Sequence, residues 1–266
     1  MVEIKLYDDF IPHMAHSIMD QAFACIEKVQ QLMSFHDPAS ELSQINRSAF
    51  QQAVRVHPWT YAVLQRAQRV FTASSGIFDC TVANTLMDWE LLPTHLPIVN
   101  PEKMNFSQAH LHCLSANKIR FTAPILLDLG GIAKGFAIDI AIYSLRKHGV
   151  KNAVVNAGGD LRVLGNIAEQ IFIRDPQAPQ QLYACGELAN GAIATSACYF
   201  SKAKNQGQWI NALVNPYTRH ALDTDHSFSV IAPNACIADA LTKVVAITQN
   251  LQHPCLPLFS AQAFIL

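Results

Sequence analysis

The residues best suited to chemistry lie in the segment DLGGIAKGFAID, residues 128–139. Its pattern predicts a tight turn at Gly130 and Gly131 and a helix that begins near Ala133. The first N–H groups of a helix lack partners and carry the positive end of its dipole, so they suit a phosphate, and Lys134 adds an electrostatic candidate. A plain strand-to-helix turn has the same pattern. Neither standard glycine-rich nucleotide fingerprint is present.

A second pair of glycines, Gly158 and Gly159, lies in the segment Asn-Ala-Gly-Gly-Asp over residues 156–160. Two glycines between strands are typical of a bulge or a turn. Together with the first pair, they are also consistent with a slot for a flat ligand, because they exclude side-chain bulk. The residues alone leave both interpretations open.

Asp239 begins a third candidate site in ADALTKVVAI, residues 238–247. On a helix, Asp239 shares a face with Thr242 and Lys243, which follow at i+3 and i+4. A carboxylate beside a hydroxyl suits a hard cation such as Mg²⁺. The alternative is an ion pair between Asp239 and Lys243, and the spacing alone favours it.

The elements that must position these residues are predicted from periodicity and turn signals. Alternation over 2–7 predicts a strand, and apolar positions from Met14 to Met33 predict a helix. The other predicted elements are a loop from His36 to Ser43, a helix from Pro58 to Gly76, a surface excursion over 85–108 with Pro93, Pro97 and Pro101, a hairpin over 111–121, strands near 125–129, 153–156, 161–164, 170–173, 191–194, 210–214 and 227–232, helices over 133–148 and 235–248, and a terminal AFIL strand. Helices early and strands later, without an internal repeat, predict one domain of mixed α and β structure.

The composition indicates a globular chain with a well-buried core. Half of the 266 residues are hydrophobic and 15% are charged, which argues against disorder. The net charge is −1 and no lysine run is present, so we expect no nucleic acid partner. The seven cysteines are scattered, which predicts reduced thiols rather than a disulfide framework or a zinc site.

The N-terminal sequence MVEIKLYDDF has neither the basic nor the apolar region of a signal peptide. No apolar run reaches the roughly 18 residues of a membrane-spanning helix. We therefore expect no membrane segment and a cytoplasmic location, or a periplasmic one if a leader has been removed.

Five blocks of the sequence resemble the ApbE family, the FAD:protein FMN transferases, in their order and spacing. The blocks are MSFHDPASELSQIN (33–46), GIFDCTV (76–82), DLGGIAKGFAID (128–139), VVNAGGDLRVLG (154–165), and IATSA, LVNPYTRHAL, SVIAP and ADAL within 193–241. Each block alone is weakly specific, but together they run from the first predicted helix to the last. The resemblance implies an α+β fold with helices packed on a mainly antiparallel sheet, in a single domain over 1–266.

The resemblance also implies an activity. The family binds FAD and Mg²⁺ and transfers the FMN half of FAD, through a phosphodiester bond, to a Ser or Thr hydroxyl of an acceptor protein, while AMP leaves. It implies metal ligands at the carbonyl of Ala133, at Asp239 and, by a shift of one position, at Thr242. The positions that it implies for FAD contacts are His36, Asp79, Cys80, Thr81, Gly130, Gly131, Lys134, Asp139, Gly158, Gly159 and Ser196.

The sequence departs from the family pattern at the metal site, where Lys243 replaces the family's threonine. A lysine ammonium opposes Mg²⁺ by charge repulsion and can pair with Asp239. Two compensations are consistent with the sequence. The hydroxyl of Thr242 can turn toward the metal, or Lys243 itself can replace part of the metal's charge at the pyrophosphate.

A second departure lies in the stretch that resembles H-I-x-D-P-x-T-G. Ala212 stands at the position of the family's base histidine, Asn215 at the aspartate and Arg219 at the glycine. His220 and His226 are near in sequence but out of register. A positioned base contributes about 10²–10⁴ in rate, so the missing histidine predicts slow transfer and leaves the catalytic residue unidentified.

The departures keep three alternatives open. They are an FAD-binding homologue with lost or reduced transferase activity, an FAD pyrophosphatase in which water replaces the acceptor, and a structural protein with the same fold. The sequence has no marker of a nicotinamide site, so a redox flavoenzyme is not favoured.

Overall fold

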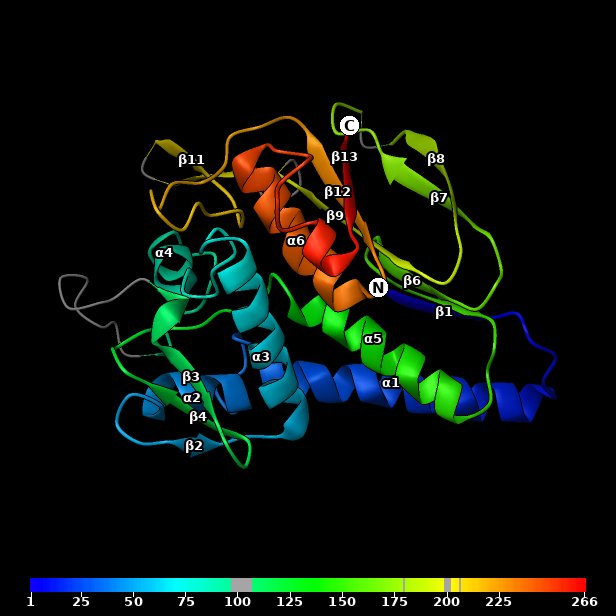
Figure 1. The fold of residues 1–266 in the computed structure, drawn as a ribbon, viewed down its shortest axis with the longest axis horizontal. Helices are drawn as coiled ribbons and strands as arrows, with labels where there is room; N and C mark the ends of the chain where they lie inside the picture. Colours follow the sequence, from blue (N-terminus) through cyan, green and yellow to red (C-terminus); the bar gives the residue numbers. More distant parts are fainter. Residues whose placement is uncertain (97–106, 179, 199–201, 206) are drawn as a thin grey trace.

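The computed structural model describes residues 1–96, 107–178, 180–198, 202–205 and 207–266. At its centre is a six-stranded sheet in which all neighbouring strands are antiparallel (Figure 1). In order across the sheet, the strands are β1 (Val2–Leu6), β5 (Ala153–Ala157), β6 (Asp160–Leu164), β9 (Ala192–Ala197), β12 (Ser227–Ala232) and β13 (Gln262–Ile265). The sheet therefore joins the two ends of the chain.

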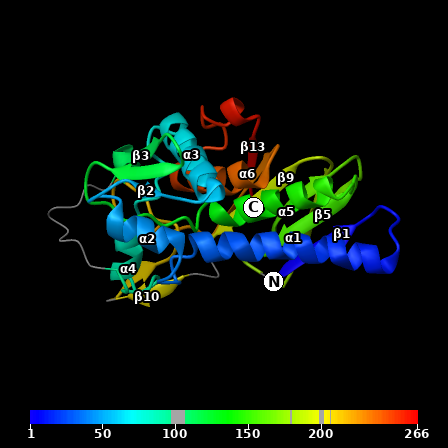
Figure 2. The same cartoon turned by 90° about the horizontal axis from the view of Figure 1, so that it is seen from below.

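Three long helices cover one face of this sheet (Figures 1 and 2). They are α1 (Pro12–Met33), α5 (Ala133–Lys147) and α6 (Ala235–Thr248). Helix α6 packs on β9 and β12, α5 packs on β5 and β6, and α1 packs on α5. No helix in the described ranges is long and apolar enough to cross a bilayer.

The opposite face of the sheet is covered by the hairpin of β7 (Glu169–Arg174) and β8 (Leu182–Leu188). A small separate core forms there, because side chains of the hairpin pack on outward-facing apolar residues of the sheet. This core contains Val154, Val163, Ile171, Ile173, Leu188 and Ile193.

The remaining elements form a lobe beside the sheet (Figure 1). They are α2 (Glu41–Ser48), α3 (Pro58–Ala73), α4 (Ala83–Asp88), the short 3₁₀ helix Gln108–His110, the three-stranded sheet β2 (Val54–Arg55), β4 (Lys118–Phe121) and β3 (Leu111–Leu114), and the pair β10 (Ala203–Asn205) and β11 (Gln208–Ile210). A second short 3₁₀ helix, Pro257–Phe259, lies between α6 and β13 in the chain. The main hydrophobic core is continuous from this lobe into the space under the central sheet.

The structure confirms the α+β prediction and most of the long elements. The predicted helices over 133–148 and 235–248 correspond to α5 and α6. The hairpin over 111–121 turns at Ala116 and Asn117, whose φ angles are 57° and 53°. These segments have strong periodicity and local turn signals, which explains why the sequence identified them.

The predicted strand over 125–129 is wrong. The segment is buried but joins no sheet, and the side chain of Asn46 replaces a neighbouring strand. Asn46 Oδ1 accepts from the N–H of Leu127 at 2.8 Å, and Asn46 Nδ2 donates to the Leu127 carbonyl at 2.9 Å. The apolar run therefore reflects burial, which periodicity alone does not distinguish from strand pairing.

Other predicted boundaries need correction. Helix α2 occupies part of the predicted loop, because Ser40 caps it by accepting a hydrogen bond from the N–H of Ser43 at 3.1 Å. The strand predicted at 210–214 ends at Ile210, and strand β8 was not predicted. Part of the predicted excursion over 85–108, including Pro97 and Pro101, lies outside the described residues.

Candidate functional site

Most of the predicted site residues line one cavity of about 530 Å³. Residues from the helix-covered sheet and from the lobe both contribute to its wall. The predicted positions and family departures on the wall are His36, Asp79, Cys80, Gly130, Gly131, Ala133, Lys134, Ser196, Ala212 and Lys243. Those not on the wall are Thr81, Asp139, Gly158, Gly159, Asp239 and Thr242.

The N-terminus of α5 opens onto this cavity. Ala133 and Lys134 form its first turn, and the two preceding glycines lie on the wall. A Cβ atom at Gly131 would lie 3.4 Å from Cε of Lys243 and 3.6 Å from a ring carbon of Phe78. Glycine at position 131 therefore keeps the approach to the helix N-terminus free of side-chain atoms.

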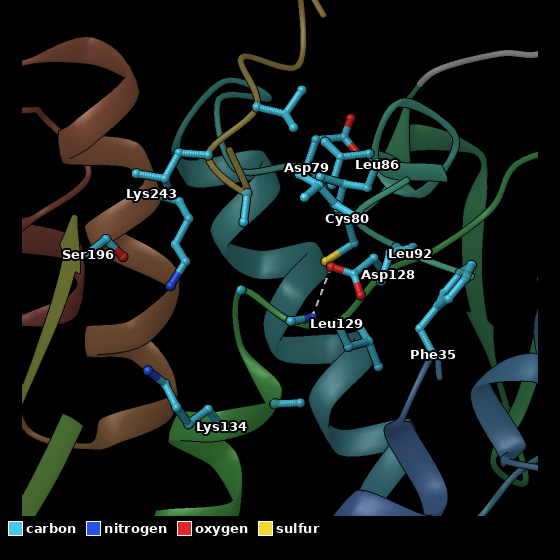
Figure 3. Close-up of a pocket in the computed structure, with 18 of the residues that line it drawn as sticks. Phe35, Asp79, Cys80, Leu86, Leu92, Asp128, Leu129, Lys134, Ser196 and Lys243 are labelled. Atoms are coloured by element: carbon cyan, nitrogen blue, oxygen red, sulfur yellow. Dashed lines mark hydrogen bonds between the residues drawn. The ribbon is translucent and has the colours of Figure 1, made fainter. Parts of the chain in front are cut away.

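Two lysines, each paired with a buried aspartate, form the charged side of the cavity (Figure 3). Nζ of Lys134 lies 2.8 Å from a carboxylate oxygen of Asp160, which is 2% exposed. Nζ of Lys243 contacts a carboxylate oxygen of Asp239, which is fully buried, and donates to the Asp239 carbonyl at 3.1 Å. The Asp239–Lys243 pairing confirms the alternative that the i, i+4 spacing favoured.

The four charges influence one another. Burial opposes the charge of Lys134, but Asp160 and Asp239 outweigh it and raise the pKa of Lys134. Burial and the charge of Asp239 raise the pKa of Asp160, against the lowering effect of both lysines. Lys134 consequently stays protonated at neutral pH, and the positive charges face the ligand space.

The residues around Asp239 do not fit a divalent cation as they stand. One carboxylate oxygen of Asp239 contacts Lys243, and the other accepts from the N–H of Gly135 at 3.0 Å. The Thr242 hydroxyl donates to the Asp239 carbonyl at 2.7 Å and lies 2.7 Å from the hydroxyl of Ser196. Among the described residues, no group of at least three His, Cys, Asp or Glu side chains could hold a metal.

The opposite side of the cavity is mainly apolar. Figure 3 shows Phe35 and Leu92 across the cavity from the two lysines. His36, one of the FAD contacts that the family resemblance implies, is on the wall and exposed. The apolar residues that line the cavity include Met33, Phe35, Ile77, Leu86, Leu91 and Leu92.

Asp79 lines the cavity and is held in a turn by Thr81, which lies behind the wall. The Asp79 carboxylate accepts from the N–H and the hydroxyl of Thr81, each at 2.7 Å. Burial raises the pKa of Asp79, and these donors and Arg219 lower it in part. Thr81 is itself buried, so its role in the described structure is to orient Asp79.

Asp128 also lines the cavity, and sequence reasoning assigned it no role. Its carboxylate accepts from the N–H of Gly130 at 3.1 Å. Burial raises its pKa, opposed by the Gly130 N–H and by the charges of His36 and Lys243. The signal in the sequence is an aspartate two positions before a glycine at a turn, which is a common side-chain-to-backbone motif.

Asp139 does not reach the cavity wall and has structural partners instead. Its two carboxylate oxygens accept from the N–H groups of Ala235 at 2.9 Å and Cys236 at 3.0 Å, which open helix α6. Arg162 of β6 lies 2.6 Å from the same carboxylate. Asp139 therefore joins α5, α6 and the sheet, while its predicted contact with FAD stays a prediction.

Gly158 and Gly159 form the tight turn between β5 and β6, with φ angles of 64° and 102°. This supports the turn interpretation. They line a different cavity, of about 640 Å³, which shares Thr195 and Ala197 with the first. Asp160, which follows this turn and pairs with Lys134, is a site residue that the sequence analysis did not single out.

The stretch after Ala212 keeps the form of a turn. Asn215 accepts through its side chain from the N–H groups of Tyr217 at 2.9 Å and Thr218 at 3.2 Å. Arg219 has a φ of 58°, the left-handed region that favours glycine, and donates to the Thr81 carbonyl at 3.0 Å. Ala212 is on the cavity wall, where its methyl group can accept no proton.

Comparison with known proteins agrees with this geometry. The ApbE family pattern matches residues 1–253. The FAD:protein FMN transferase of Treponema pallidum is 25% identical over 267 residues, which cover 91% of this chain and 74% of that protein. The FAD:protein FMN transferase of Vibrio cholerae is 28% identical over 230 residues, which cover 81% of this chain and 69% of that protein.

Solved structures show the same fold. The ApbE protein of Thermotoga maritima has a TM-score of 0.85 and 25% identity, and the match covers 99% of this chain and 90% of that one. The flavin transferase ApbE of Vibrio cholerae has a TM-score of 0.81 and 22% identity, with 99% and 89% covered. From the family match over nearly its whole length and the shared fold, this chain belongs to the ApbE family.

Proposed function

We propose that this protein transfers the FMN half of FAD to a Ser or Thr hydroxyl of an acceptor protein. The observation that carries the proposal is the cavity with the N-terminus of α5 and two lysines on one side and, on the other, a mainly apolar wall that also contains Asp79 and Asp128. The charged side suits a pyrophosphate, and the apolar side suits the flavin ring. Relatives named FAD:protein FMN transferase support the same activity.

The reaction exchanges the phosphoanhydride bond of the pyrophosphate for a phosphoester bond to the acceptor. The acceptor hydroxyl oxygen attacks the phosphorus of the FMN half, the bond from that phosphorus to the bridging oxygen breaks, and AMP leaves. Lys134 and Lys243 are placed to stabilise the negative charge that develops on the phosphoryl oxygens. A base must take the hydroxyl proton, and Ala212 cannot serve as that base.

The residues around Asp239 do not fit a magnesium ion as they stand, so this proposal does not require the ion that the family resemblance implies. By the resemblance, the ion would be held by the carbonyl of Ala133, by Asp239 and, by a shift of one position from Lys243, by Thr242, and it would neutralise the pyrophosphate. Because Lys243 already contacts the Asp239 carboxylate, we expect weak Mg²⁺ binding. The mechanism proposed for this chain assigns no step to the ion.

The test is to incubate the protein with FAD and an acceptor that bears a target Ser or Thr, and to detect covalent FMN by mass spectrometry and AMP by chromatography. We expect slow transfer, and we expect Ala212→His to accelerate it by about 10-fold or more if the new imidazole reaches the acceptor. Ala203→His, an exposed position away from the cavity wall, is the matched control.

The outcomes separate the alternatives. Free FMN and AMP without labelled acceptor would identify a pyrophosphatase instead. Saturable quenching of flavin fluorescence without any product would identify an FAD-binding protein that has lost transfer, for which Ala212 is the structural reason. Fast transfer that Ala212→His does not change would show that another residue of the cavity is the base.

A further inference from the structure

The charged side of the cavity is balanced without any added ion. Its two buried carboxylates, Asp160 and Asp239, face the two ammonium groups of Lys134 and Lys243. A buried carboxylate without a partner is strongly unfavourable, so each lysine supplies a charge that the fold requires. The cluster is therefore complete before a ligand arrives.

A divalent cation at Asp239 would have to displace this arrangement. It would lie beside the ammonium of Lys243, and it would need oxygen atoms that Gly135 and Thr242 already engage. Mg²⁺ binds six oxygen ligands in a near-ideal octahedron and loses its water reluctantly. The local arrangement thus favours a lysine over a metal at this point.

Both lysines also retain donors for a ligand. An ammonium has three N–H donors, and Lys243 directs two of them to the carboxylate and the carbonyl of Asp239. Its third N–H is available on the cavity side, where Lys243 and Lys134 extend into the same region (Figure 3). A lysine that stays paired with an aspartate while it donates to a phosphate leaves no buried carboxylate uncompensated.

We propose that Lys243 is a built-in cation that takes the place of a divalent metal at the pyrophosphate of FAD, together with Lys134. This inference rests on the proposed function, because it concerns the same ligand. It predicts that the protein binds FAD with the same affinity whether or not Mg²⁺ is present. It also predicts that removal of the Lys243 charge creates a metal requirement.

The test measures the dissociation constant of FAD by quenching of flavin fluorescence, in EDTA and in a series of Mg²⁺ concentrations. For the wild type, we expect the dissociation constant of FAD in EDTA and the one in Mg²⁺ to agree within about threefold. For Lys243→Thr, we expect binding in EDTA to weaken by about 10-fold or more, and Mg²⁺ to restore it. Lys147→Thr, an exposed lysine at the end of α5, is the matched control and should change neither constant.

Two results would overturn the inference. One is wild-type FAD binding that EDTA abolishes and Mg²⁺ restores, a measurement that needs no variant and so does not depend on the folding of Lys243→Thr. The other is a folded Lys243→Thr protein that binds FAD in EDTA as tightly as the wild type. Absence of FAD binding under every condition would instead overturn the proposed function itself, and with it this inference.

Discussion

The segments 128–135 and 156–160 both contain adjacent glycines beside an aspartate, but the glycines are needed for different reasons. Neither Gly130 nor Gly131 has a positive φ, and neighbouring atoms limit the space around them. Gly158 and Gly159 both have positive φ angles, and a Cβ atom at either would meet nothing within 4 Å. The first segment is restricted by space and the second by backbone conformation, and only the first adjoins the paired lysines of the cavity.

The largest expected effect concerns Gly135, the third glycine of the crowded segment. A Cβ atom there would lie 2.1 Å from the carbonyl oxygen of Ala235, where α5 crosses α6. We expect Gly135→Ala to lower the free energy of unfolding by about 3 kcal/mol or more, because backbone atoms must shift. Denaturant unfolding measures it, and Gly131→Ala is the control, because Gly131 has no positive φ and a Cβ atom there would make only ordinary contacts of 3.4 Å or more. Equal losses in both variants would mean that space does not restrict the first segment.

The next largest effect is expected for Gly131→Val, which should weaken FAD binding without lowering the stability of the fold. In Gly131→Val, the side chain would occupy the approach to the N-terminus of α5, while its Cβ atom would make only ordinary contacts of 3.4 Å or more with Lys243 and Phe78. We expect the affinity for FAD to fall by about 10-fold or more and the melting temperature to change little. Flavin fluorescence and thermal melting measure the two quantities, and Ala203→Val is the control. Unchanged FAD binding in Gly131→Val would remove the cofactor role of this turn.

Substitutions in the turn of the second segment, Gly158 and Gly159, should lower stability and leave the affinity for FAD nearly unchanged. Gly159→Ala forces an alanine into a φ of 102°, so we expect a loss of about 1–3 kcal/mol in stability and FAD affinity within about twofold of the wild type. Gly158→Asn, at a φ of 64°, should cost less than Gly158→Ala because asparagine tolerates the left-handed region. A large loss of FAD affinity in a folded Gly159→Ala protein would instead support the predicted cofactor contact.

The smallest effect concerns Asp128, the aspartate of the first segment. Burial raises its pKa, so the folded protein holds this proton more tightly than the unfolded chain does. Stability from this group is therefore present at low pH and is lost as pH rises from the unfolded value through the folded one. Asp128→Asn should raise the melting temperature at neutral pH, and the gain should shrink toward pH values near 4. A gain that does not depend on pH would point to a cause other than ionisation.

The sequence predicted the elements whose signals are local. Helix α6 has its cap at Asn234 and an apolar face, and the pairing of Asp239 with Lys243 follows from helical spacing. The turn at Gly158 and Gly159, one of the two interpretations of this glycine pair, also follows from a local signal, because adjacent glycines between strands are typical of a turn. Family resemblance then identified eight residues on the wall of one cavity, namely His36, Asp79, Cys80, Gly130, Gly131, Ala133, Lys134 and Ser196.

The features that the sequence did not predict depend on contacts between distant segments. The side chain of Asn46 pairs with the backbone of Leu127, which no periodicity reveals. The pairing of Lys134 with Asp160 joins a helix start to a strand start. Arg219, in a left-handed conformation, reaches the carbonyl of Thr81 from another part of the chain. Such contacts arise from tertiary packing, so each residue alone carries no signal for them.

The carboxylate of Asp139 should restrict the separation of α6 from α5, a motion that hydrogen exchange of backbone amides measures. The Asp139 carboxylate accepts from the N–H groups of Ala235 and Cys236 and pairs with Arg162 of the sheet, so a separation of α6 from α5 breaks two hydrogen bonds to a charged acceptor. These amide protons should exchange with deuterium only through openings that approach complete unfolding. Helices α5 and α6, which carry Lys134 and Lys243, are thereby held as one cooperative unit. A ligand therefore meets two ammonium groups whose positions are already set.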